Sequence, residues 1–139
     1  MKTGYEAAPV RLSISRERTD SPPGRITSFT MTIPIIPWKS LTSVVSVGLT
    51  SEGWNLAEVP AGAPDLPRTY TLDVLFPEPF NTVPLVHASI TGFDIDNRDT
   101  ARISVAVNNV TTTGFHLAVT TWRGTRVYSV EVSWLVLGN

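Results

Sequence analysis

The 139-residue sequence contains no cysteine and only two histidines, His87 and His116. Without cysteine, disulfide bridges, zinc–thiolate sites and cysteine nucleophiles are excluded. The two histidines fall in different predicted strands, and neither has the usual cluster of metal ligands around it. No metal site and no cofactor is therefore expected. The absence of cysteine also suits synthesis in a reducing cytosol.

Charged residues are few, and the two signs nearly cancel: Lys and Arg number 11, Asp and Glu number 12, and the net charge is −1. This balance gives no reason to expect a nucleic-acid partner. Long apolar runs are absent, because prolines or charges interrupt each run before the roughly 20 residues that a membrane span needs. No apolar segment follows Lys2, so no secretory signal is expected. We expect cytoplasmic synthesis without membrane insertion, and release or display on a surface or particle stays open.

Helical periodicity is missing, whereas runs rich in β-branched and aromatic residues recur about every ten residues between turn signals. This pattern is typical of an antiparallel β-sandwich, and it predicts an all-β fold. Residues 1–39 are interpreted as an N-terminal extension or docking arm, and residues 40–139 as the domain. The long polar loop at residues 55–67 is of a kind that more often serves a function than not. Strands are predicted near residues 10–14, 26–33, 41–49, 69–76, 84–91, 101–107, 115–122 and 126–137.

Residues 115–137 form the stretch around which the chain is organised, because two long strand-like runs flank a short turn with Gly124. The pattern predicts a β-hairpin. Trp122, Arg123, Arg126 and Tyr128 gather at this turn, where small polar residues would suffice. An exposed aromatic beside cations at a loop tip is typical of a site for a polar, ring-shaped ligand. From this stretch alone, the stronger interpretation is that the two aromatics are ordinary core residues.

Other patterns that could carry chemistry are weak. The acidic segment 94–99 resembles a calcium loop, but it lacks that loop's glycine and places Arg98 at a ligand position, so a solvated turn is predicted. No nucleophile elbow, P-loop or dinucleotide fingerprint occurs. Glu58, Asp65 and Glu78 could supply a glycosidase pair, but nothing in the sequence places two of them together. No enzymatic activity is expected.

A set of short motifs runs in order through residues 44–138. They are Gly53-Trp54, Leu75-Phe76 followed by Pro79-Phe80, Pro84-Leu85-Val86, Ser89-Ile90-Thr91, the Asp94 loop, Arg102, residues 110–115, Thr121-Trp122, residues 125–129 and Ser133-Trp134. In this order and spacing the motifs resemble the H-type lectins. That family includes the snail agglutinin specific for N-acetylgalactosamine (GalNAc) and the C-terminal domain of the discoidins.

The resemblance implies a six-stranded antiparallel β-sandwich that assembles as a homotrimer, with sugar sites in the clefts between protomers. Asp65 matches the family's loop aspartate, which accepts hydrogen bonds from galactose-type hydroxyls, and Arg102 matches the arginine that donates to the sugar. Trp122 and Tyr128 match the tryptophan and tyrosine that line the same cleft. A galactose-type ring suits such a set, because it offers a C–H face to an indole and hydroxyls to charged groups.

Two positions depart from the family pattern. Arg123 stands where the snail lectin has histidine, and Ala63 stands where it has glycine, two residues before the aspartate. Arg123 adds length and positive charge at the rim of the implied site, and Ala63 adds a methyl group where the backbone approaches the sugar. The choice between galactose and GalNAc, and whether the glycan is larger or acidic, is therefore open. The snail lectin's cysteines are missing, so any hexamer needs other contacts.

The function implied by the resemblance is that of a carbohydrate-binding lectin for terminal GalNAc or galactose, acting in agglutination or cell adhesion. The alternative is a structural role, in which the domain is the spike or fibre tip of a larger particle. Residues 1–39 would then dock it there, because this proline-punctuated extension has no counterpart in the snail lectin. The two roles are compatible, since a spike can also bind glycans.

Overall fold

The computed structural model describes residues 38–139 and, before them, the backbone of residues 11–14 and 29–32. The chain divides into two compact units, Met1–Pro37 and Trp38–Asn139. In the first unit, β1 (Arg11–Ile14) pairs antiparallel with β2 (Phe29–Thr32), where the sequence predicted strands. The other residues of the predicted docking arm before Trp38 lie outside the described residues, and the role of the arm stays a prediction.

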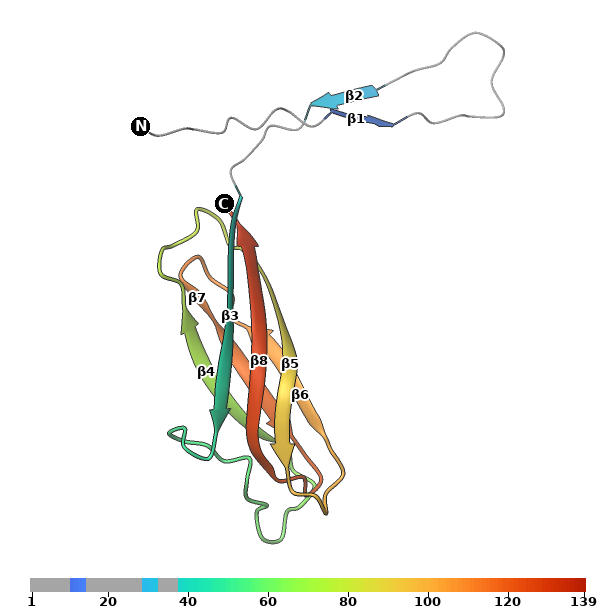
Figure 1. Cartoon of the computed structure of the whole chain (residues 1–139), viewed down its shortest axis with the longest axis vertical. Coiled ribbons are helices and arrows are strands. Elements are labelled where there is room, and N and C mark those ends of the chain that lie inside the picture. Colours follow the sequence, from blue (N-terminus) through green and yellow to red (C-terminus); the bar gives the residue numbers. More distant parts are fainter. Residues whose placement is uncertain (1–10, 15–28, 33–37) are drawn as a thin grey trace, which may run out of the picture. The chain divides into compact units, whose positions relative to one another are not determined.

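The second unit is a sandwich of two three-stranded antiparallel sheets, as Figure 1 shows. One sheet has the order β3-β8-β5 and the other the order β4-β7-β6. The strands are β3 (Lys39–Gly48), β4 (Arg68–Leu75), β5 (Leu85–Ile95), β6 (Ile103–Asn108), β7 (Gly114–Thr121) and β8 (Val127–Gly138). The all-β, six-stranded fold is thereby confirmed. None of the described residues lies in a helix, so among them there is no helix that could span a membrane.

The core lies between the inner faces of the two sheets, and the central strands β7 and β8 supply most of its buried side chains. Alternation along β7 buries Phe115, Leu117 and Val119, and β8 contributes valines from the opposite side. The ring of Phe115 meets that of Trp134 edge-on, with 5.7 Å between ring centroids. Such period-two burial is what the sequence pattern predicts for strands with one face inward.

The connection between β7 and β8 is not a hairpin, so that prediction for residues 115–137 is wrong. The two strands belong to different sheets and pair with different neighbours. Arg123 and Gly124 form the tight turn with φ values of 52° and 77°, and the chain then crosses the end of the core. Both strands bury their inward side chains over most of their length. Such strands are stabilised at the centres of opposing sheets, where these side chains face each other across the core.

Candidate functional site

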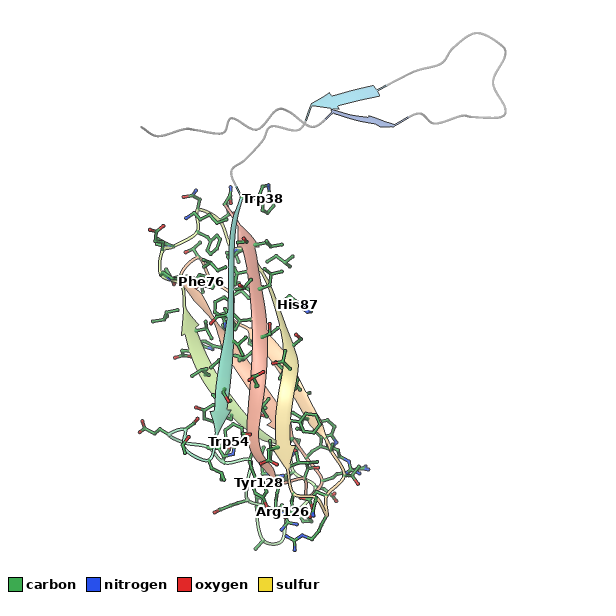
Figure 2. The ribbon with its side chains drawn as sticks, in the orientation of Figure 1. Trp38, Trp54, Phe76, His87, Arg126 and Tyr128 are labelled. Carbon is green, nitrogen blue, oxygen red and sulfur yellow. The ribbon has the colours of Figure 1, made fainter. Side chains whose placement is uncertain are left out.

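Three connections meet at one end of the domain (the loop end). They are the β3–β4 loop (residues 49–67), the β5–β6 loop (residues 96–102) and the β7–β8 turn (residues 122–126). The strand registers place Arg68 and Ile103 on either side of Thr121, so these three chain segments are adjacent there. In Figure 2, Trp54 lies at the loop end near Arg126 and Tyr128, whose labels stand together.

The β3–β4 loop is irregular but firmly attached to the start of β8. The indole Nε1 of Trp54 donates a hydrogen bond to the carbonyl of Val127 (2.9 Å), and the Val127 N–H donates to the carbonyl of Leu56 (2.9 Å). Leu56 is fully buried, and the Trp54 ring packs on Tyr70 with 5.0 Å between centroids. These contacts hold the first part of the β3–β4 loop in place, and the tip of the loop follows it.

Arg68, the first residue of β4, joins the loop to the turn from inside. Its guanidinium donates to the carbonyls of Leu56 (3.2 Å) and Glu58 and to the carbonyl of Thr125. Only 7% of the residue is exposed, and its Nε has no hydrogen-bond partner. Burial lowers the pKa of Arg68, and the charge of Asp99 partly opposes this shift. The sequence prediction gave Arg68 no role. Its parity with Tyr70, which also faces inward, was the signal that it points into the domain.

The segment that contains Asp65 lies against the β7–β8 turn. The N–H of Gly124 donates to the carbonyl of Pro64 at 2.9 Å, which ties the loop tip to the turn. Asp65 and Arg123 are exposed, whereas Ala63 and Trp122 are half-buried. The structure thus brings together four of the predicted site positions: Ala63, Asp65, Trp122 and Arg123.

Arg102 lies immediately before β6, not within a strand, and its side chain is half-buried. The Oγ1 of Thr121 donates to the Arg102 carbonyl at 2.6 Å, so Arg102 neighbours the residue that precedes Trp122. The following Ile103 packs against the core.

Tyr128 points toward the β5–β6 loop, where Asp96 is only 5% exposed. The Tyr128 hydroxyl donates to Asp96 Oδ2 at 3.0 Å. Arg98 donates to the same carboxylate through its backbone N–H (3.0 Å), Nε (2.8 Å) and Nη2 (2.6 Å). These bonds from Arg98 hold the pKa of Asp96 well below its usual range. In turn, the hydrogen bond to Asp96 raises the pKa of Tyr128.

Asp99 is the second carboxylate held in this way. Arg126 donates to it through its backbone N–H (2.9 Å), Nε (3.1 Å) and Nη2 (3.1 Å), which lowers the pKa of Asp99. The Asp96 N–H also donates to the Arg126 carbonyl at 3.0 Å. The solvated turn predicted for residues 94–99 is confirmed at Asp94, Asn97 and Arg98, which are exposed, but it is wrong for Asp96 and Asp99. Arginines from the loop itself and from the β7–β8 turn enclose its two central carboxylates, a partnership that local sequence does not reveal.

A shallow groove of about 340 Å³ opens beside this network. Its lining consists of Asp94, Ile95, Asp96, Asn97, Arg98 and Tyr128. Within residues 38–139 and the two described N-terminal strands, no group of three His, Asp or Glu side chains is arranged to hold a metal ion.

Comparison with known proteins gives a family match for residues 71–136 and structural neighbours for the sandwich. The family model of the H-type lectin domain matches residues 71–136. Two structures of discoidin II from Dictyostelium discoideum share the fold, each with a TM-score of 0.58 and with 22% and 23% sequence identity. The matches cover 78% and 79% of this chain but only 41% and 42% of discoidin II. Residues 71–136 therefore match the H-type lectin domain, the sandwich has the fold of discoidin II, and the resemblance inferred from the sequence is confirmed.

A protein of Fuscovulum blasticum, described as "ATP synthase subunits region ORF 7", is 38% identical over 73 residues. The match spans 52% of this chain and 64% of that protein.

The sugar-binding roles of the six predicted residues stay predictions. Among the described residues, no hydrogen bond joins the side chains of Asp65, Arg102, Trp122 and Tyr128 to one another. What the structure brings together is the chain segments that carry them.

Proposed function

We propose that this H-type lectin domain binds glycans that end in a galactose-type sugar, GalNAc or galactose, at the loop end. The family match supports carbohydrate binding rather than catalysis in general terms. The observation that carries the finer proposal is the 2.9 Å hydrogen bond from Gly124 to Pro64. It holds the segment of the exposed Asp65 carboxylate beside the turn of Trp122 and Arg123.

The chemistry of these side chains complements such a sugar. The half-buried indole of Trp122 can cover the C–H face of the ring, which is a common use of aromatic side chains with one wet and one apolar side. The Asp65 carboxylate accepts hydrogen bonds from hydroxyls, and Arg102 donates to them. Arg123 extends a further donor from the tip of the turn, held there by its left-handed backbone conformation.

The internal hydrogen bonds of the loop end support the same proposal. Arg68 anchors the β3–β4 loop, and Arg126 together with Asp99 anchors the β5–β6 loop to the turn. A site whose loops are already fixed loses less conformational freedom when a ligand binds. This matters for a shallow lectin site, because each sugar contributes few contacts.

The proposal includes a homotrimer whose sites lie between protomers, as the family resemblance implies. Val44, Leu85 and Leu135 support an oligomer, because the strand registers place them on the outward face of sheet β3-β8-β5, where all three are exposed. Exposed apolar groups that share a face often mark a protein contact. Several sites on one particle would raise binding to cell surfaces through avidity. Sedimentation equilibrium tests the trimer directly, and a monomer at micromolar concentration would contradict it.

The decisive experiment is calorimetric titration with GalNAc and galactose, preceded by a glycan array. Asp65→Ala and Arg102→Ala should each weaken binding by at least about tenfold, because a hydrogen bond to a charged group contributes about 1.5–3 kcal/mol. Trp122→Ala should weaken it as well. The matched control is Asp73→Ala, whose carboxylate is 74% exposed on the outer face of the other sheet and should be neutral.

An array without signal for any galactose or GalNAc epitope would refute the proposal. Unchanged affinity in all three site variants would place the site elsewhere. Circular dichroism of each variant separates a lost contact from a lost fold.

A second role, docking to a larger particle, is favoured by the division of the chain into two units. It would display the lectin domain on a particle surface, with residues 1–37 as the attachment. Deletion of residues 1–37 should then abolish co-purification with the particle while glycan binding persists. A protein that purifies alone as a trimer and is unaffected by the deletion would exclude this role.

A further inference from the structure

The groove beside Tyr128 is shallow and open, and its walls carry polar side chains and an aromatic ring. Its volume of about 340 Å³ falls at the lower end of the roughly 300–1,000 Å³ usual for small-molecule pockets. It lies at the loop end. In the sequence, Tyr128 follows Arg126, whereas Trp122 and Arg123 precede it. The N–H of Asp96, which lines the groove, donates to the Arg126 carbonyl at 3.0 Å. The groove is thus joined through Arg126 to the turn that carries Trp122 and Arg123.

One buried carboxylate fixes two walls of this groove. Asp96 accepts hydrogen bonds from both Arg98 and Tyr128, so the guanidinium and the phenol ring keep their positions without a ligand. Arg98 nevertheless remains 72% exposed. It has five N–H donors and uses two for Asp96, so three remain for a ligand. The phenol oxygen of Tyr128 donates inward and can still accept a hydrogen bond.

Asp94 and Asn97 complete the polar lining. Both side chains are exposed and line the groove. Together the walls offer carboxylate and amide acceptors, guanidinium and amide donors, and the surface of an aromatic ring. That is the set that recognises a hydroxylated ring with one apolar face.

The charge balance of the groove favours a neutral ligand. Arg98 pairs with Asp96 and Arg126 pairs with Asp99, with Nη2–carboxylate distances of 2.6 and 3.1 Å. These pairs cancel and leave Asp94 as the one uncompensated charge of the lining. An anionic ligand would meet the Asp94 carboxylate at close range, and the one cation of the lining, Arg98, is already paired with Asp96.

We propose that this groove is a second sugar subsite, which receives the neutral sugar next to the terminal residue of a glycan bound at the Trp122 turn. The proposal rests on the proposed function and deepens it, since it makes the preferred ligand at least a disaccharide. Asp94, Asn97 and Arg98 are the specificity-determining residues of the subsite.

Calorimetric titration tests this subsite with two probes: methyl α-GalNAc, and a neutral disaccharide in which the same GalNAc is linked to galactose. The wild-type protein should bind the disaccharide about tenfold more tightly, which corresponds to about 1.4 kcal/mol. Asp94→Asn and Asn97→Ala should lose most of this advantage and keep the monosaccharide affinity. Both residues are exposed and outside the Asp96 network, so these variants should fold normally. Asp73→Asn is the matched control and should keep both affinities.

Equal affinity of the wild-type protein for the two probes would overturn the subsite and leave the proposed function intact. A disaccharide advantage that survives both substitutions would also overturn it. Tighter binding of a disaccharide in which a uronic acid replaces the galactose would refute the neutral assignment. Binding of neither probe would reject the proposed function and the subsite together.

Discussion

Replacement of Arg68 tests how the loop end is held together. Arg68→Met keeps a long unbranched side chain but removes the guanidinium, which donates to carbonyls of Leu56, Glu58 and Thr125. The Leu56 carbonyl would keep its hydrogen bond from the Val127 N–H. The carbonyls of Glu58 and Thr125 would lose the donor that they have in the native domain.

The magnitude follows from these two lost bonds. Hydrogen bonds from a charged donor contribute about 1.5–3 kcal/mol each, which gives roughly 3–6 kcal/mol for two. Part of this loss is recovered, because folding of the native domain removes a guanidinium with an unpaired Nε from water, and the variant avoids that cost. We expect a net decrease in the free energy of unfolding of about 3 kcal/mol. For a domain of about 100 residues, the melting temperature should fall by roughly 12–24 °C.

Urea unfolding followed by tryptophan fluorescence measures this change. Arg68→Lys should fall between the wild type and Arg68→Met, because an ammonium can replace only part of the fork of donors. The matched control is Arg102→Met. Thr121 bonds to the backbone carbonyl of Arg102, which the substitution keeps, so the free energy of unfolding should fall by less than about 1 kcal/mol. The reasoning is refuted if Arg68→Met loses less than about 1 kcal/mol, or no more than the control.

Three further predictions concern pH, the turn and the core. Asp96 has a pKa below its ordinary value of 3.8, so its contribution to stability is present above that pH and is lost as the pH falls through the folded-state pKa. Asp96→Asn should therefore flatten the acid limb of urea-unfolding curves and shift the raised pKa of Tyr128 back toward 10.0 in an ultraviolet titration; an unaltered limb would contradict this. Gly124→Ala should cost about 1–2 kcal/mol in thermal unfolding because its φ is 77°, with no steric addition since nothing lies within 4 Å of the new Cβ. Phe115→Ala should cost about 3–5 kcal/mol, and a loss under about 1 kcal/mol would mean that this ring is not in the core.

The strands could be predicted because alternation is a local property. Val86 and Ile90 share one parity and pack against the core, and Ile103 and Val107 do the same in β6. The end of β5 was missed because of Gly92. A register shift between Ile90 and Gly92 lets the strand continue to Ile95, beyond its predicted end.

The neighbour of each strand could not be predicted in the same way. Alternation decides which side chains face the core, but it does not decide whether the next strand joins the same sheet. The turn at Arg123 and Gly124 has the positive φ values that hairpins also use, so the local signal was genuine and its interpretation was wrong. Pairing of β8 with β3, far away in the sequence, determined the outcome.

The candidate site, too, could be predicted only in part. Asp65 and Trp122 were chosen through a family resemblance, and their segments do meet at the loop end. Asp96 was assigned to solvent because its partners Arg98 and Tyr128 cannot be inferred from charge spacing alone. Exposure of a loop carboxylate depends on side chains that other segments bring to it.

The position of β8 in its sheet has a consequence for how the domain is made. Both β3 and β5 pair only with β8, which is the last strand of the described chain, and Lys39 is paired with Gly138. During synthesis, β3 and β5 therefore leave the ribosome with unpaired edges, long before β8, which pairs with both, emerges. Such edges invite pairing with other chains, and distant pairings form slowly. A nascent chain that stalls before residue 127 should accordingly need chaperone protection, while one that is completed closes its sheet from the centre outward.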